Sequence, residues 1–210
     1  MRVTGLDQSL VNSGLAYYCG DGIYGCDNWR TDIGEVKKLK GIARLDWIKK
    51  QLAEELAIGT DLLVLEGRSP AGISDALSLG GLFAVLELTA FERNVPVLVV
   101  PPASRIAYMS RGKMSTRDGT EVLKRSAVNL ARSEFGFDQD IDDNEADALY
   151  LARIGAHYLG LIVDVDPKRQ EVIANLRLTP EERKRAEQDR KIAEAARIVA
   201  SRSKACQEVS

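Results

Sequence analysis

Residues 3–18 read VTGLDQSLVNSGLAYY, and this stretch sets the beginning of the fold. An apolar run ends on Asp7, a Gly/Ser turn follows, and a second run of β-forming residues leads to a pair of tyrosines. A third β-rich run follows after Gly20 and Asp21, which are turn-forming residues. We therefore expect three successive strands, at residues 2–7, roughly 12–20 and roughly 22–31.

After this meander the pattern changes to helices that alternate with short buried strands. Apolar residues recur at helical spacing, with charged residues on the other face, in the first of these helices. Runs of four or five apolar residues bounded by glycine or proline are typical of buried strands. The order predicts an α/β protein with a mixed sheet. The expected helices lie at 35–58, 73–94, 120–135 and from about 142 onward, and the expected strands at 62–65 and 96–100.

Acidic residues stand where these elements end. Asp7 closes the first strand, and Glu66 closes the strand of LLVLEGRS (62–69). Asp147 lies on the last helix, in DDNEADALYLARIGA (142–156), with Asp143 one turn before it. Parallel neighbouring strands would bring the strand-end carboxylates to one sheet edge, where ligands bind. Carboxylates that meet there repel one another unless divalent cations bind them, so we expect a metal-dependent enzyme acting on phosphate esters.

The joint pattern resembles the RuvC family of Holliday junction resolvases, within the RNase H-like superfamily. The resemblance implies an RNase H-like fold with a five-stranded mixed sheet flanked by helices, and a homodimer. It also implies four acidic residues that bind two Mg²⁺, or Mn²⁺, and cut two symmetric strands of a four-way double-stranded DNA junction in recombination and repair. It covers about residues 1–160 and is carried by Gly5-Leu6-Asp7, Ser13-Gly14, Leu65-Glu66 and Ala146-Asp147-Ala148-Leu149.

The mechanism that we expect is hydrolysis assisted by two cations. One metal lowers the pKa of a bound water, the second stabilises the leaving 3′ oxygen, and the hydroxide attacks the phosphate in line, which leaves 5′-phosphate ends. The candidate catalytic and metal-binding residues are Asp7, Glu66, Asp143 and Asp147.

Two positions depart from the RuvC pattern. The family usually has an acid three residues before the final Asp, where this chain has Asn144. We take Asp143 as the fourth ligand, although a helix cap is the alternative reading for that residue. The family often has a large apolar residue shortly after the glutamate, whereas Gly67, Arg68 and Ser69 follow it here. A relaxed nuclease that cuts forks, flaps or recombination intermediates is therefore the main alternative, and an ATP-handling protein of the actin or sugar-kinase type is a distant one.

Basic residues are expected to contact DNA locally, because the net charge of the main part is negative. Residues 1–164 carry 18 Lys+Arg against 23 Asp+Glu, whereas residues 165–210 carry 11 against 8. A polyanion must then be bound by patches rather than by the field of the whole molecule. Residues 103–119 form a polar, basic and glycine-containing loop in this interpretation. The candidate DNA contacts are Arg68, Arg105, Arg111, Lys113 and Arg117.

Two further segments have open interpretations. The helix at 73–94 is apolar around most of its circumference, which favours a homodimer contact, with burial inside one subunit as the alternative. Residues 165–210 form a charged helical extension beyond a nuclease domain at 1–164. This extension could grip DNA, contact another protein or be a solvated helix.

The remaining features favour a cytoplasmic protein without a membrane partner. The sequence has no run of about 18 or more uncharged apolar residues and no charged-then-apolar leader. Its three cysteines have neither disulfide nor zinc-site spacing. The single histidine, His157, lies among apolar helix residues, and we expect it to be structural.

Overall fold

The computed structural model of the chain describes residues 1–22, 24–67, 73–137, 140–179, 181–186 and 188–189. The chain divides into two compact units, Met1–Ile173 and Ala174–Ser210. The predicted boundary at residue 165 lies before the end of the first unit, and the features below belong to that unit except for residues 174–177 of the last helix. Within the described ranges, no helix has the length and apolarity that a membrane crossing needs.

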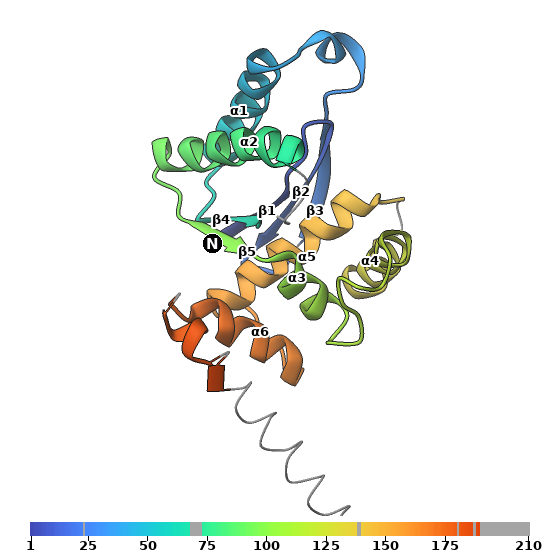
Figure 1. The fold of residues 1–210 in the computed structure, drawn as a ribbon, viewed down its shortest axis with the longest axis vertical. Helices are drawn as coiled ribbons and strands as arrows, with labels where there is room; N and C mark the ends of the chain where they lie inside the picture. The colour runs from blue at the N-terminus through green and yellow to red at the C-terminus, as the bar shows by residue number, and fades with distance from the viewer. Residues whose placement is uncertain (23, 68–72, 138–139, 180, 187, 190–210) are drawn as a thin grey trace, which may run out of the picture. The chain divides into compact units, whose positions relative to one another are not determined.

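Five strands form one mixed sheet in the order β3-β2-β1-β4-β5 (Figure 1). The first three strands pair antiparallel as a meander, whereas β1 with β4 and β4 with β5 pair parallel. The predicted five-stranded mixed sheet is therefore confirmed. The strands are β1 (Arg2–Asp7), β2 (Asn12–Cys19), β3 (Tyr24–Arg30), β4 (Leu62–Glu66) and β5 (Val97–Val100).

The helices agree with the predicted pattern in all but two places. The predicted helix at 35–58 is interrupted, because Gly41 adopts a positive φ of 51° and separates a 3₁₀ turn from α1. The predicted loop at 103–119 begins with a helix, because Pro102 supplies a favourable first helical residue. The helices are η1 (Gly34–Lys38), α1 (Ile42–Ala57), α2 (Ile73–Glu92), α3 (Pro102–Met109), α4 (Thr120–Phe135), α5 (Asp143–Tyr158) and α6 (Pro167–Arg177).

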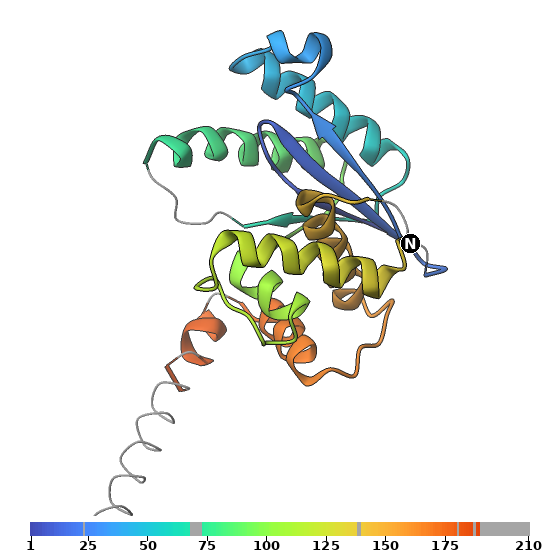
Figure 2. The same cartoon turned by 90° about the vertical axis from the view of Figure 1, so that its right-hand side faces the viewer.

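Helices cover both faces of the sheet. Figures 1 and 2 show α1 and α2 on one face, and α5 with α3 and α4 on the other. On the first face Leu6 and Leu65 of adjacent strands share a buried apolar cluster with Leu52 of α1 and Leu86 of α2. Side chains alternate along a strand, so the residues on either side of Leu6 and Leu65 point to α5.

Helix α5 lies unusually close to the strands, and glycines permit this approach. A Cβ on Gly5 of β1 would lie 2.4 Å from the Ala148 carbonyl oxygen and from the Ala152 nitrogen of α5. A Cβ on Gly14 of β2 would lie 2.0 Å from the Asn144 carbonyl oxygen. Real Cβ atoms do not approach backbone so closely, so α5 reaches this depth only over residues without a side chain. The glycines of the GLD and SG motifs thus seat the helix that carries Asp147.

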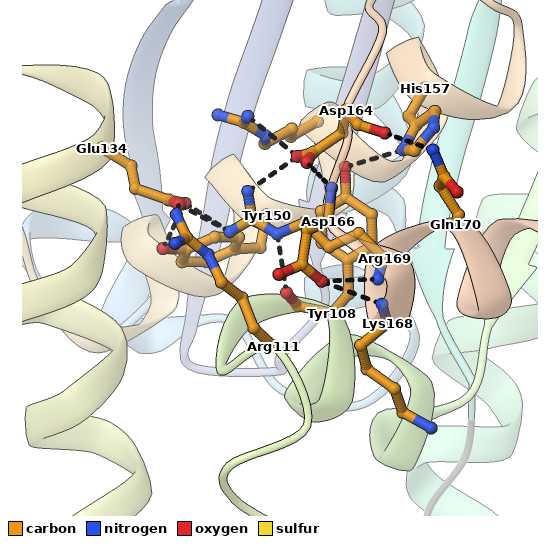
Figure 3. A network of polar contacts seen from close by, with 11 residues as sticks. Tyr108, Arg111, Glu134, Tyr150, His157, Asp164, Asp166, Lys168, Arg169 and Gln170 are labelled. Carbon is orange, nitrogen blue, oxygen red and sulfur yellow. Dashed lines mark hydrogen bonds and ion pairs between the residues drawn. The ribbon is translucent and has the colours of Figure 1, made fainter.

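A buried polar network holds the start of α6 against α3, α4 and α5 (Figure 3). The Arg169 side chain is 1% exposed. Its guanidinium donates to both carboxylate oxygens of Glu134 at 2.7 Å, to Asp164 at 2.8 Å and to the Tyr108 carbonyl at 3.0 Å. Buried charges are stable in a protein when they are paired and hydrogen-bonded in this way. His157 lies in the same region, 3.2 Å from the Tyr108 hydroxyl.

Candidate active site

The ends of β1 and β4 place Asp7 and Glu66 side by side. The parallel register pairs Leu6 with Leu65, so the residue after each lies at the same edge of the sheet. Each acid is two positions beyond a residue that faces α5, namely Gly5 and Val64. Gln8 also joins the two strand ends, since its amide donates to the Glu66 carbonyl at 2.5 Å. Both carboxylates therefore emerge at the same carboxyl edge, where the sequence placed them, and the structure puts them on the side that α5 covers.

The N-terminal turn of α5 brings a third and a fourth acid to this edge. The Asp142 side chain accepts a hydrogen bond from the Glu145 backbone at 2.8 Å, and Glu145 accepts one from the Asp142 backbone at 2.8 Å. This capping box makes Asp142 the N-cap. Asp143 is not needed as the cap and lies one turn before Asp147, on the same side of the helix.

These acids border one cavity. A pocket of about 240 Å³ is lined by residues from β1, α3, α4 and α5. Asp7, Asp143 and Asp147 all line it. Asn144, which stands where the RuvC family usually has an acid, lines it too. Glu66 joins the group through its bond to Arg105, which also lines the pocket. The tertiary structure thus gathers all four predicted acids around one site.

The carboxylates in this site are costly to ionise together. Burial raises the pKa of Asp7 well above its usual value, and the charges of Asp147 and Glu66 raise it further. Burial also raises the pKa of Asp147 to about 7, against the opposing effect of Arg105. Carboxyl groups behave in this way when desolvation and like charges act together. Groups with such shifted pKa values in a cavity are typical of functional sites.

Arg105 supplies the positive charge within the cluster. Its Nε donates to the Glu66 carboxylate at 2.5 Å, and its Nη1 bonds to the Asp147 carboxylate. The side chain is almost buried, at 9% exposure for the residue. Sequence reasoning placed Arg105 among the DNA contacts, whereas the structure turns its guanidinium to the two carboxylates rather than to solvent. The difference arises because Arg105 lies on a helix, α3, that points it back to the sheet edge.

The donor set suits a hard divalent cation, although Arg105 now occupies part of it. All of the converging donors are carboxylate or amide oxygens, which Mg²⁺ and Mn²⁺ accept. Burial and neighbouring carboxylates raise the pKa values of Asp7 and Asp147 even with the guanidinium present, and a bound cation would favour their charged forms. In the part of the chain that the structure describes, no group of three Asp, Glu, His or Cys side chains is placed to hold one metal ion. The chemistry of these donors suits a divalent cation, whereas their present placement does not form a site for one.

The other predicted DNA contacts lie apart from the acids. Arg68 falls outside the described residues. Arg111 is exposed at the end of α3, has a positive φ of 53° and bonds to Glu134 of α4 at 2.7 Å. Lys113 and Arg117 are exposed on the connection between α3 and α4.

Lys124 is a residue of the site that sequence reasoning missed. Its ammonium lies 2.8 Å from the Asp143 carboxylate, and its side chain lines the acidic pocket. The signal for it was weak, because Lys124 is one of several basic residues on an ordinary amphipathic helix. Only the packing of α4 beside α5 distinguishes it from its neighbours.

Comparison with known proteins identifies the fold. No protein-family model and no curated protein matches the sequence. Among solved structures, Thermus thermophilus RuvC matches with a TM-score of 0.58 and 19% identity, over 77% of this chain and 96% of that chain. The same protein in complex with a Holliday junction substrate matches with a TM-score of 0.59 and 17% identity, over 77% and 96%. The fowlpox virus Holliday junction resolvase matches with a TM-score of 0.50 and 12% identity, over 77% and 100%.

These matches extend along almost the whole length of the two proteins and share the sheet and helix arrangement of this chain. At this level of identity they establish architecture rather than activity. They confirm the fold class that the motifs predicted from the sequence. The chain therefore has the fold of RuvC, with a mixed five-stranded sheet flanked by helices.

Proposed function

We propose that this protein is a metal-dependent endonuclease that resolves four-way DNA junctions. The observation that carries the proposal is the convergence of Asp7, Glu66 and Asp147 at the carboxyl edge of β1 and β4, next to a cavity. This cluster lies on the fold of RuvC, and one of the similar structures contains a Holliday junction substrate. A cluster of carboxylates beside a cavity is suited to cations and a phosphodiester.

The roles of the residues follow from their positions. Asp7, Glu66 and Asp147 would hold the cations, with Asp143 as the fourth ligand at the pocket rim. Bound Mg²⁺ or Mn²⁺ would supply an activated water and would stabilise the leaving oxygen, and we propose two ions in each site. Gln8 fixes the two strand ends relative to each other, which keeps the carboxylates in place. Lys124 neutralises Asp143 and adds positive charge on the side from which a phosphate would approach.

Binding of branched double-stranded DNA is proposed for the exposed basic residues outside the acidic pocket. Arg111, Lys113 and Arg117 lie on the connection from α3 to α4, and both of these helices line the pocket. A strand held by this connection would have its phosphates near the acids. Because the net charge of residues 1–164 is negative, such local contacts must supply the attraction to DNA.

A homodimer is proposed because symmetric cuts in two strands need two active sites. On α2, Leu88 is 51% exposed and Phe91, one turn later, is 79% exposed, while Leu82 and Leu86 are buried in the subunit core. One face of α2 is thus used within the subunit, and the other offers apolar side chains. A second copy of the chain would bury them.

The alternative is a nuclease with relaxed selectivity for branched DNA. It is favoured by the sequence after Glu66, where this chain has small and polar residues. The RuvC family often has a large apolar residue there, which can insert as a wedge between bases at the centre of a junction. A site without such a wedge would still hydrolyse phosphodiesters but would discriminate less between a junction and a fork.

The deciding experiment compares a synthetic four-way junction, a replication fork and a linear duplex, each with and without Mg²⁺. We expect Mg²⁺-dependent paired cuts in the junction, with products that a ligase can seal because they carry 5′ phosphates. Equal cutting of the fork would support the relaxed nuclease instead. No cleavage of any DNA in Mg²⁺ or Mn²⁺ would refute nuclease activity.

Variants of the acids test the assignment of the site. Asp7→Asn or Glu66→Gln should lower the cleavage rate at least about 100-fold, since even indirect partners of metal ligands change affinity or activity about 10–100-fold. Junction binding should remain, because the loss of a negative charge does not weaken the attraction between the basic residues and DNA phosphates. Glu35→Gln, at an exposed position of η1, serves as the matched control and should cleave normally. Wild-type cleavage by Asp7→Asn would remove Asp7 from the site.

A further inference from the structure

Arg105 occupies the centre of the acidic cluster. Its guanidinium bonds to Glu66 and Asp147 at once, from the same side chain. The charge of Asp7 acts on it as well. These contacts link β4, α5 and α3 through one buried cation, which is permanently charged because it is an arginine.

Arg105 binds the carboxylates of two residues that are candidate metal ligands. A divalent cation binds carboxylate oxygens directly, at about 2.0–2.6 Å depending on the ion. The Glu66 oxygen is already 2.5 Å from the Arg105 Nε. A guanidinium and a divalent cation placed on the same oxygens would also repel each other strongly in this buried position. The two cations therefore compete for Glu66 and Asp147.

We propose that Arg105 is an internal competitor of the metal, whose guanidinium occupies Glu66 and Asp147 in the metal-free protein and leaves both when a divalent cation binds. The inference rests on the proposed function, because it takes the acidic cluster to be a metal site. Its consequence is that Arg105 stabilises the empty site and lowers the affinity for metal. A resting protein of this kind keeps its fold without an ion.

The structure has room for the displaced side chain. The pocket of about 240 Å³ that Asp7, Asp143 and Asp147 line is lined by Arg105, Thr120 and Leu123 as well, and its open volume lets the guanidinium move off the two carboxylates. A guanidinium that has left both carboxylates is free to bind a DNA phosphate, because arginine binds phosphate through two parallel hydrogen bonds. This movement joins two roles in one residue, since Arg105 pairs with acids in the empty site and with DNA in the loaded site.

The test measures Mn²⁺ binding in the absence of DNA, by electron paramagnetic resonance of the free ion, for the wild type and Arg105→Met. We expect the variant to bind Mn²⁺ about tenfold more tightly or better, because charge-assisted hydrogen bonds no longer oppose binding. Its melting temperature in EDTA should fall, and the rise on adding Mn²⁺ should exceed that of the wild type. Equal or weaker Mn²⁺ binding by Arg105→Met would overturn the proposal.

A second variant covers the case in which Arg105→Met does not fold without metal. Arg105→Lys keeps the charge but cannot bridge two carboxylates in the same way, so its Mn²⁺ affinity should lie between those of the other two proteins. A Lys variant with wild-type affinity or weaker would then overturn the proposal.

Two controls identify the site that is measured. Arg30→Met removes an arginine from an exposed pair with Asp32 and should leave Mn²⁺ affinity unchanged. Asp147→Asn should abolish the tight binding. If neither the wild type nor the Arg105 variants bind Mn²⁺, the proposed metal site itself is wrong, whereas equal binding by all of them refutes only the competition.

Discussion

At the scale of single residues, the acids of the site illustrate a conflict between stability and function. Asp7 is held where burial and two neighbouring carboxylates make its charge unfavourable. A protein that used Asp7 only for packing would have no reason to keep an acid at this position. The unfavourable charge becomes useful when a cation binds, because the cation then gains from every carboxylate that faces it.

The first prediction concerns the stability of the empty site. Asp7→Asn should raise the melting temperature in EDTA by about 2–4 °C, the shift that about 1 kcal/mol gives in a protein of this size. The neutral amide replaces a carboxyl group whose pKa is raised by burial and by the charge of Asp147. The free-energy cost of ionising that group in the folded protein is therefore removed. Differential scanning fluorimetry with and without Mg²⁺ measures both effects, since the same variant should lose the stabilisation by Mg²⁺. A lower melting temperature in EDTA would mean that the Asp7 charge is compensated in the empty site.

At the scale of elements, the position of α5 determines the site. This helix carries Asp143 and Asp147, and it packs on β1 and β2 through backbone contacts at Gly5 and Gly14. Its own small residues, such as Gly155, allow the same approach further along, where a Cβ would lie 2.5 Å from Val3 and Val64. A separation between helix and sheet that is larger by one methyl group would move Asp147 away from Asp7.

The second prediction tests this close packing. Gly5→Ala should destabilise the protein by about 3 kcal/mol or more, because the new methyl group would overlap the backbone of α5. It should also lower Mg²⁺-dependent cleavage, as Asp147 is displaced. Urea unfolding and junction cleavage measure the two effects. Gly81→Ala is the matched control, since its Cβ would meet its nearest neighbour at 3.9 Å, and it should be neutral or stabilising by about 0.5–1 kcal/mol.

The third prediction concerns the network around Arg169, which ties α6 to α3 and α4 (Figure 3). Arg169→Met should cost about 3–5 kcal/mol at neutral pH, because it leaves Glu134 and Asp164 buried with fewer partners. The exposed pair of Arg30 and Asp32 provides the control, and Arg30→Met should change stability by less than about 1 kcal/mol.

The same network predicts a pH dependence of stability. Burial raises the pKa of Asp164, but hydrogen bonds from Arg169 and from the Asp166 backbone lower it more, to about 2. A carboxyl whose pKa is lower in the folded than in the unfolded state stabilises the fold above about pH 4, and this contribution is lost as the pH falls towards 2. The urea midpoint of Arg169→Met should therefore change less than that of the wild type between pH 5 and pH 3, roughly the range over which the unfolded acid titrates. Equal slopes would show that Arg169 does not set this pKa.

At the scale of the whole molecule, the fold of one subunit does not explain why apolar side chains are exposed on α2. Leu88 and Phe91 lie one turn apart and are largely exposed, although each would contribute about 1.5–3 kcal/mol if buried. The opposite face of the same helix contributes to the core of the subunit. The two interpretations of this helix that the sequence left open, burial inside one subunit and a homodimer contact, are therefore compatible with each other.

The fourth prediction follows from this face. The wild type should be a dimer in solution, and Phe91→Glu should convert it to a monomer, because a carboxylate cannot be buried there without a partner. Light scattering coupled to size-exclusion chromatography measures the change. Val163→Glu, at another exposed apolar residue, should leave the dimer intact. A wild type that is monomeric at all concentrations would refute the dimer.

Much of the fold followed from local patterns. The three-strand meander, the strands β4 and β5 and the helices α2, α4 and α5 were all predicted close to their observed bounds, because hydrophobic periodicity and turn residues are local signals. The errors occurred where one residue with special backbone preferences outweighed a pattern. Gly41 interrupts a helix that periodicity predicted to be continuous, and Pro102 starts a helix in a segment that looked like a loop.

The sequence by itself determined which acids the chain has and where each one ends or begins an element, and so it predicted a sheet edge rich in carboxylates. Only the tertiary structure decided that Arg105 lies between Glu66 and Asp147 and that Lys124 belongs to the site. The physical reason is that strand ends and helix caps follow from interactions between neighbours in the chain. The position of a long side chain among charges from other elements depends instead on how closely those elements pack, and no local pattern records that distance.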